Sequence, residues 1–203
     1  CSSDLVDNMD TTRSYNAING TTDATPAASS TNHGTMVAGI IGAAADNAKG
    51  VIGVAPNIKM AAMNWLENQT YQNLERAWLT GVGANEIAVT NNSWGSFFDN
   101  DSIYDALLRD GTSNLRSGKG RVYVMAAGNS RHIGHNANLT YVQSTRYTVN
   151  VAALKYDNTY AFYSTPGSNV LVSGYAGTFD TVDPTIGTTA PMGTGNQNGL
   201  DTW

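Results

Sequence analysis

Apolar and polar positions alternate in two distinct patterns from residue 33 onward. Apolar residues recur with the period of an amphipathic helix over 33–45, 70–81 and 101–111. Short continuous apolar runs, which are typical of buried strands, cover 58–66, 86–94, 120–129, 146–154 and 169–177. Residues 6–32 are polar and rich in turn-forming residues, so we expect surface loop there.

The alternation of buried strands with helices predicts an α/β fold. Strands that read as continuous apolar runs indicate a parallel sheet covered on both faces. In open α/β sheets, ligands bind beyond the carboxyl ends of the strands. Two polar clusters, "TNNSWG" and "AAGNS", follow apolar strands directly, so we expect them at the functional edge of the sheet.

The two helices nearest the chemistry carry clear local signals. In the helix predicted over 33–45, Met36 and Ile40 share one face with Ala43 and Ala44, while Gly39 and Gly42 lie on another. Because glycine has little bulk, a neighbouring backbone can approach that helix closely. In the second helix, Thr70 is the expected N-cap, with Leu74, Ala77 and Trp78 facing inward.

Composition and charge exclude several classes of function. The 203 residues are 41% hydrophobic and 13% charged with a net charge of −5, as expected of one globular domain without a nucleic-acid surface. No apolar run is long enough to span a bilayer. A single cysteine excludes an internal disulfide framework and any multi-cysteine zinc site.

Three segments carry candidate chemistry, and each also has a plain structural interpretation. His33 opens a helix of small residues that would fix its ring for general-base work, although a lone histidine is more often structural. Asn129 is either a turn residue or an amide donor to an oxyanion. The "NNSWG" segment is either a buried strand followed by a core tryptophan or an edge that pairs with an extended peptide.

A zinc site is an alternative use of the histidines. His132 and His135 form H-x-x-H, which could combine with His33. That spacing needs a helix to converge, whereas "GNSRHIGHNAN" reads as loop without a nearby glutamate base.

Taken in order, "HGTMVAGII", "DNAKGVIGVAP", "NNSWG" and "VMAAGN" resemble the subtilisin-like serine proteases, or subtilases, over nearly the whole chain. The segments "SYNAINGTTDATP", "RSGKGRVYVMAAGN" and "YAFYSTPGSNVLVS" are most similar to the kexin/furin-like branch. The resemblance implies a three-layer subtilisin-like fold with a mostly parallel central sheet, incomplete at both ends.

The resemblance also implies roles for particular residues. His33 would be the general base of an Asp-His-Ser triad, and Asn129 the oxyanion-hole donor. Peptide would bind along two segments, Ser93, Trp94 and Gly95 on one side and Ala126, Ala127 and Gly128 on the other. The family's aspartate and serine motifs are expected before residue 1 and after Trp203, so residues 1–203 would form a partial catalytic domain.

Calcium is the implied cofactor, held by the Asp4 carboxylate, the Asn47 side chain and the carbonyls of Ala44, Lys49 and Val51. Where furin-like enzymes carry the acids of a second calcium site, this chain has His135 and Thr165. Thr140 replaces the acid that selects basic residues. We therefore do not carry dibasic specificity over.

The expected function is a serine endopeptidase, monomeric, extracellular or in the cell envelope of a bacterium, acting on peptides in extended conformation. The alternative is a catalytically inactive subtilase-like domain that binds extended peptides. Because the base and the oxyanion donor lack a nucleophile here, we expect the 203-residue chain alone to hydrolyse no peptide at a useful rate.

Overall fold

The computed structural model describes residues 3–27, 32–95, 101–177, 186–190 and 200–202. They fall into two compact units, each described by itself. Unit 1 comprises residues 1–77, 81–83 and 186–203, and unit 2 comprises residues 78–80 and 84–185.

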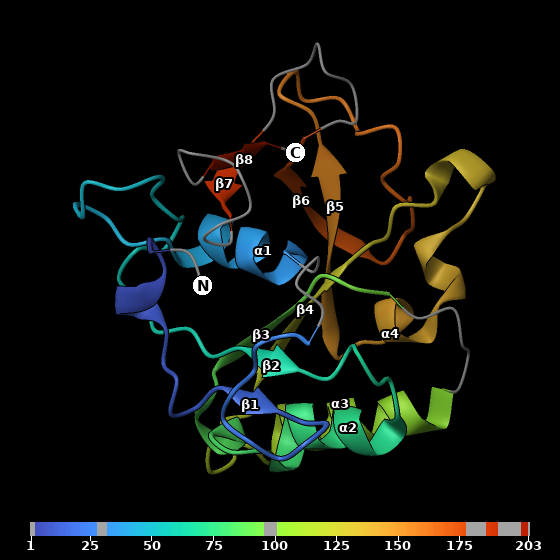
Figure 1. Ribbon diagram of the computed structural model, residues 1–203. Coiled ribbons are helices and arrows are strands. Elements are labelled where there is room, and N and C mark those ends of the chain that lie inside the picture. Colours follow the sequence, from blue (N-terminus) through green and yellow to red (C-terminus); the bar gives the residue numbers. More distant parts are fainter. Residues whose placement is uncertain (1–2, 28–31, 96–100, 178–185, 191–199, 203) are drawn as a thin grey trace. The chain divides into compact units, whose positions relative to one another are not determined.

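Unit 2 is built on a four-stranded parallel sheet (Figure 1). Its order is β3 (Val89–Asn92), β4 (Val122–Ala126), β5 (Thr148–Leu154) and β6 (Val170–Tyr175). The register pairs Asn92 with Met125, and Ala126 with Val151. The four predicted strands of this region are confirmed, and so is the α/β class; β3, β4 and β6 are shorter at both ends than predicted, and β5 only at its start.

Helix α3 (Asp101–Ser113) packs on β4 through a buried apolar face that includes Leu107 and Leu108. Gly111 lies directly against the hydroxyl of Tyr123 on β4, where a Cβ would overlap it. The predicted helix over 101–111 is thus confirmed and runs two residues further. The remaining helices of unit 2 are short: η3 (Ala84–Glu86), η4 (Arg131–Ile133), η5 (Ala137–Leu139) and α4 (Tyr141–Ser144).

A buried aromatic cluster forms the core of unit 2 beneath β3 and β4. The ring of Trp78 lies 5.1 Å from that of Tyr123 and 5.9 Å from that of Trp94. The indole N–H of Trp78 donates to Asn92 Oδ1 at 3.2 Å. Arg121 is also buried, and its guanidinium donates to the carbonyls of Trp78, Ala84 and Ile87. Because three carbonyls satisfy it, this buried cation needs no carboxylate partner.

Unit 1 contains helix α1 (His33–Gly42) and two small sheets. Strands β1 (Tyr15–Asn16) and β2 (Met63–Asn64) pair in parallel, and β7 (Gly187–Thr189) pairs antiparallel with β8 (Leu200–Thr202). A 3-10 turn, η1 (Val6–Asn8), precedes β1.

The strand expected over 58–66 is present in only two short pieces. Met60 bridges Met9, and β2 pairs with β1. Backbone bonds from Met60 to Asn8 and from Tyr15 to Ala62 keep the two segments side by side. The prediction of one long strand here was therefore wrong in its extent.

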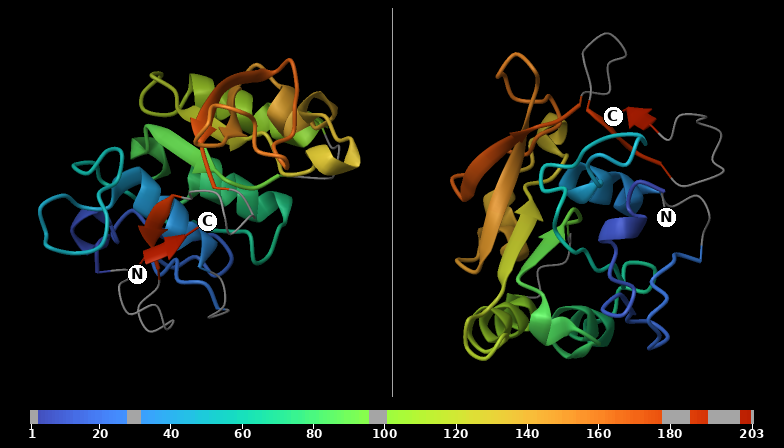
Figure 2. Two further views of the ribbon diagram at one scale, coloured as in Figure 1. Left: turned by 90° about the horizontal axis from the view of Figure 1, so that it is seen from above. Right: turned by 90° about the vertical axis from the view of Figure 1, so that its left-hand side faces the viewer.

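Helix α1 ends at Gly42 rather than at residue 45 because tertiary bonds take over the alanines. Ala43 leaves helical geometry with ψ 137°, its carbonyl accepts from Gly53, and the N–H of Ala44 donates to the carbonyl of Asp4. The glycine face is the buried one. At Gly39 a Cβ would overlap the side chains of Thr188 and Thr189, and Figure 2 shows β7 lying beside α1. The expected close approach is thus made by threonines of β7.

The segment predicted as a helix over 70–81 divides into α2 (Tyr71–Glu75) and a π-helical turn, η2 (Arg76–Thr80). Thr70 is the N-cap as predicted, because its side chain accepts from the N–H of Asn73 at 3.2 Å. Leu74, Ala77 and Trp78 are buried, as expected.

Candidate active site

The first residue of α1 is His33, which places its ring at the start of the helix in unit 1. The carbonyl of Asn32 accepts from the N–H groups of Thr35 and Met36 at 2.9 and 3.1 Å, which fixes the first turn. His33 is exposed as a residue, yet neighbouring atoms remove enough water from its ring to lower the pKa of His33 below its ordinary value of 6.5. A lowered pKa keeps the imidazole neutral near pH 7, which is the form a general base needs.

In unit 2 the loop after β4 presents Asn129. Gly128 turns the chain out of the strand with φ 106°, a conformation that favours glycine, and a Cβ there would lie 3.0 Å from Thr165 Oγ1. Asn129 itself is exposed, and no described residue pairs with its side-chain amide. The amide N–H is therefore available to an incoming oxygen.

The two predicted peptide-binding segments leave neighbouring parallel strands at the same end of the sheet. Because Asn92 pairs with Met125, residues 93–95 and 126–128 begin at the same level. Gln143 links the two segments: its amide donates to the carbonyl of Ala126 at 3.0 Å, and its Nε2 would lie 3.4 Å from a Cβ at Gly95. Nothing in the sequence marks Gln143, because a single glutamine in a short helix carries no pattern.

The six residues of these segments differ in exposure. Gly95 is exposed, whereas Ala127 is 3% exposed and donates its N–H to the carbonyl of Val151. The ring of Trp94 packs against that of Trp78. At least one side of the Trp94 ring therefore belongs to the core, as the structural interpretation of this residue predicts. That the six residues of segments 93–95 and 126–128 contact the substrate stays a prediction. That His33 and Asn129 face one common cleft also stays a prediction.

The loop predicted to bind calcium closes around Asp4 in unit 1. Asp4 is 2% exposed; its Oδ1 accepts from Asn47 Nδ2 and its Oδ2 from the N–H of Val51, both at 2.8 Å. The backbone passes through positive φ at Asp46 (57°), Ala48 (57°) and Gly50 (32°). A Cβ at Gly50 would overlap the Asp4 carboxylate. The loop therefore encloses a buried carboxylate, an oxygen donor suited to a hard cation. The Asn47 amide presents its nitrogen to that carboxylate, and its oxygen accepts from the N–H of Lys49 at 3.0 Å.

The histidines of the zinc alternative lie on loop structure. His132 belongs to the 3-10 turn η4, and Gly134, with φ 77°, separates it from His135. Over the residues that the structure describes, no group of three or more His, Cys, Asp or Glu side chains could hold a metal ion. Within the same residues, no helix combines the length and the apolar character needed to cross a membrane.

Solved structures define the class of this fold. A crystal structure of a serine protease of Aeromonas sobria superposes with a TM-score of 0.81 at 29% identity, covering 93% of this chain and 36% of that one. A cold-adapted subtilisin-like serine proteinase superposes with a TM-score of 0.67 at 19% identity, covering 99% of this chain and 63% of that one. The protein has the subtilisin-like α/β fold.

Sequence comparison agrees with the fold. The Subtilase family, described as Peptidase_S8, matches residues 2–200, and the chain belongs to that family. It is 32% identical to the Aeromonas extracellular serine protease of Aeromonas sobria, over 92% of this chain and 34% of that protein. It is 27% identical to human furin over 85% of this chain and 23% of furin. The chain thus spans about a third or less of the length of these two relatives.

Proposed function

We propose that the intact protein is a serine endopeptidase in which His33 is the general base and Asn129 an oxyanion-hole donor. The observation that carries this proposal is the Asn129 amide, exposed and without a described partner at the end of β4, beside the segments that would bind a peptide. Membership of the subtilase family supports the same reaction class.

In this mechanism a peptide lies extended along residues 93–95, the segment that directly follows β3, and pairs with its backbone. Neutral His33 takes the proton of the attacking serine hydroxyl and later gives it to the leaving amine. Asn129 donates to the carbonyl oxygen as negative charge develops on it. The nucleophile and the third member of the triad are not assigned to any residue of this chain.

We propose calcium as the structural cation of the Asp4 loop. The carboxylate of Asp4, the amide oxygen of Asn47 and the carbonyls of Ala44, Lys49 and Val51 would hold it. The buried carboxylate beside Gly50 supports the fit, whereas the Asn47 oxygen would have to leave the N–H of Lys49 to reach the cation. The cation would neutralise Asp4 and stiffen the loop that follows α1. It takes no part in bond cleavage.

We also propose an extracellular or cell-envelope location, which the Aeromonas extracellular protease supports, and a monomeric catalytic domain. The alternative, a domain that holds extended peptides without cutting them, would use the same segment, residues 93–95, but would need neither the imidazole nor the amide.

The test is peptide hydrolysis by the intact protein and its His33→Ala variant, with His132→Ala as the matched control because His132 is exposed on a loop. Removing the base should lower turnover by about 10⁶-fold, while peptide binding persists and His132→Ala retains activity. A serine-directed phosphonate should inactivate the wild type. An undiminished rate in His33→Ala would remove the proposed base, and binding without any hydrolysis by the wild type would establish the alternative.

A further inference from the structure

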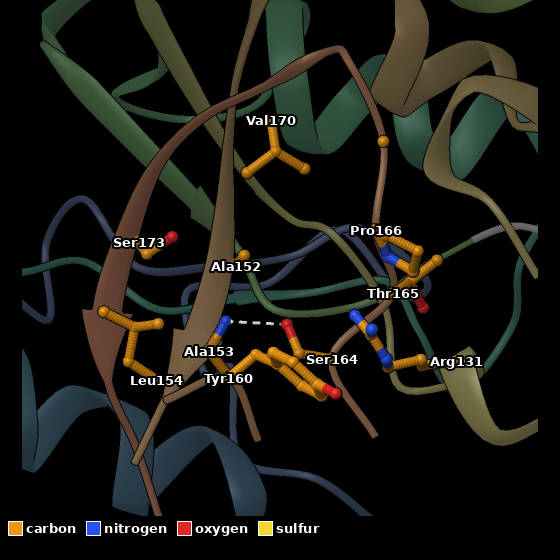
Figure 3. A pocket seen from close by; sticks show the side chains of 11 residues that line it. Arg131, Ala152, Ala153, Leu154, Tyr160, Ser164, Thr165, Pro166, Val170 and Ser173 are labelled. Atoms are coloured by element: carbon orange, nitrogen blue, oxygen red, sulfur yellow. Dashed lines mark hydrogen bonds between the residues drawn. The ribbon is translucent and has the colours of Figure 1, made fainter. Parts of the chain in front are cut away.

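A cavity of about 220 Å³ lies in unit 2 where β5 extends beyond the end of β4 (Figure 3). Its walls come from β5, β6 and the segment 160–167, with Arg131 at one side. Most of the wall is aliphatic, contributed by Ala152, Leu154, Val170 and Pro166. The cavity can therefore accept an apolar stem.

Arg131 is the only charged side chain among the residues that line this cavity. Its guanidinium lies 3.7 Å from the centre of the Tyr160 ring, so the two groups stack, and Figure 3 shows them next to Ser164. No described residue accepts a hydrogen bond from the guanidinium. A planar, stacked guanidinium with unused N–H groups has the geometry that binds a carboxylate by two parallel hydrogen bonds.

Two buried hydroxyls add further donors. Ser164 Oγ accepts from the N–H of Ala153 at 2.9 Å, and Thr165 Oγ1 accepts from the N–H of Ser130 at 2.9 Å. Ser164 is 4% exposed and Thr165 fully buried. Since each oxygen already accepts a hydrogen bond and neither hydroxyl hydrogen has a described acceptor, each can still donate one.

The cavity is attached to the segment that carries Asn129. Thr165 donates its N–H to the carbonyl of Gly128 at 2.9 Å, and Arg131 donates its N–H to the carbonyl of Tyr163 at 3.1 Å. Together with the bond from Ser130 to Thr165, these contacts tie residues on both sides of Asn129 to the cavity wall. Arg131 follows Asn129 by two positions in the chain, so both belong to the segment that these bonds attach to the cavity wall.

We propose that this cavity is a subsite for an acidic side chain of the peptide substrate, with Arg131 as its carboxylate-binding residue and Ser164 as an accessory donor. The inference rests on the proposed peptide cleavage and names a substrate class for it. A glutamate fits best, because its aliphatic stem can cover the apolar wall while its carboxylate meets the guanidinium.

The test uses peptides in which one glutamate is moved along an otherwise neutral sequence, each paired with the same peptide carrying glutamine. At one position, the intact wild-type protein should favour glutamate by about tenfold in kcat/KM, the scale of one charge-assisted contact. Arg131→Met should abolish the preference. Arg146→Met is the matched control, since Arg146 also stacks on a tyrosine, Tyr147, but lies outside the cavity. If Arg131→Met does not fold, Arg131→Lys replaces it and should show a weaker preference than the wild type.

Calorimetric binding of the same peptides to the His33→Ala variant separates this inference from the proposed reaction. If the wild type cleaves no peptide, the proposed function fails, yet binding still reports whether Arg131 selects glutamate. A missing glutamate preference, or one that survives in Arg131→Met, would overturn the subsite. Binding of free glutarate that depends on Arg131, without a preference among peptides, would also overturn it.

Discussion

The side-chain amide of Gln143 donates a 3.0 Å hydrogen bond to the carbonyl of Ala126, the last residue of β4. Gln143 is 5% exposed, and its own backbone carbonyl accepts from Asn150 and from Asn169, the latter at 2.7 Å. The short helix α4 is thereby fixed to the strand from which Asn129 emerges.

Replacing Gln143 with leucine should keep the volume but leave the Ala126 carbonyl without its partner. We expect the free energy of unfolding to fall by about 1–3 kcal/mol. We also expect the KM for the peptide to rise several-fold, because residues 126–128 lose the hydrogen bond that holds Ala126 in position. Urea titration and steady-state kinetics measure the two effects. Gln72→Leu, on the exposed side of α2, is the control and should change neither; an equally stable Gln143→Leu would show that the bond is dispensable.

Changing Asn129 to alanine should lower kcat by about 10²–10³ while KM changes little, because the amide would contact the oxygen only as it becomes charged. Steady-state kinetics on one peptide measure both constants. Since the amide has no described partner in the fold, thermal stability should be retained. If the variant instead showed a raised KM with an unchanged kcat, Asn129 would act in substrate binding and not in catalysis.

The acid limb of the pH profile should report His33. Desolvation lowers the pKa of His33 below 6.5, so the neutral base persists to a lower pH than an ordinary histidine would allow. As pH falls, log kcat/KM should therefore decline with an apparent pKa below 6.5. A limb centred above 6.5 would contradict this assignment, and His132→Ala should leave the limb unmoved.

Gly39→Ala should destabilise the fold by about 1–3 kcal/mol, because the added methyl group overlaps the side chains of Thr188 and Thr189. Gly34→Ala on the same helix is the matched control. No atom lies within 4 Å of a Cβ there, so that change should be neutral or slightly stabilising. Chemical denaturation of both variants measures the difference; equal stabilities would show that α1 and β7 do not pack as described.

Calcium removal should lower the melting temperature of the wild type, because a ligand that binds only the folded state stabilises it. Asp4→Asn should weaken that calcium dependence, since the buried carboxylate is its proposed charged ligand. Differential scanning calorimetry with calcium and with a chelator gives the shift for each protein. Asp7→Asn, an exposed acid on η1, should respond to calcium as the wild type does. A wild type with no calcium response would refute the site.

The elements that periodicity predicts well are those whose signal is local. Thr70 caps its helix through a contact three residues away, and the strands of unit 2 read directly from continuous apolar runs. Gly39 was identified as a place of close approach, but its partner was not, because β7 is a strand of three residues with no apolar pattern.

The candidate site shows the same division. His33 and Asn129 were found because the residues around them form recognisable motifs. Gln143, and the stacking of Arg131 on Tyr160, depend on side chains that the fold brings together across 17 and 29 sequence positions, and nothing local marks them. The helix that begins with His33 ends early for a similar reason, since Asp4 and Gly53 take the hydrogen bonds of Ala44 and Ala43.

The contact between α1 and β7 joins two segments that are synthesised at very different times during translation. Thr189 Oγ1 donates to the carbonyl of Thr35 at 2.7 Å across 154 sequence positions. During synthesis on the ribosome, the helix that carries His33 therefore emerges long before the strand that holds it. A contact between residues so far apart in sequence slows folding, and it delays the docking of this helix until Thr188 and Thr189 have been synthesised. The position of the His33 helix therefore depends on a strand that lies more than 150 residues later in the chain.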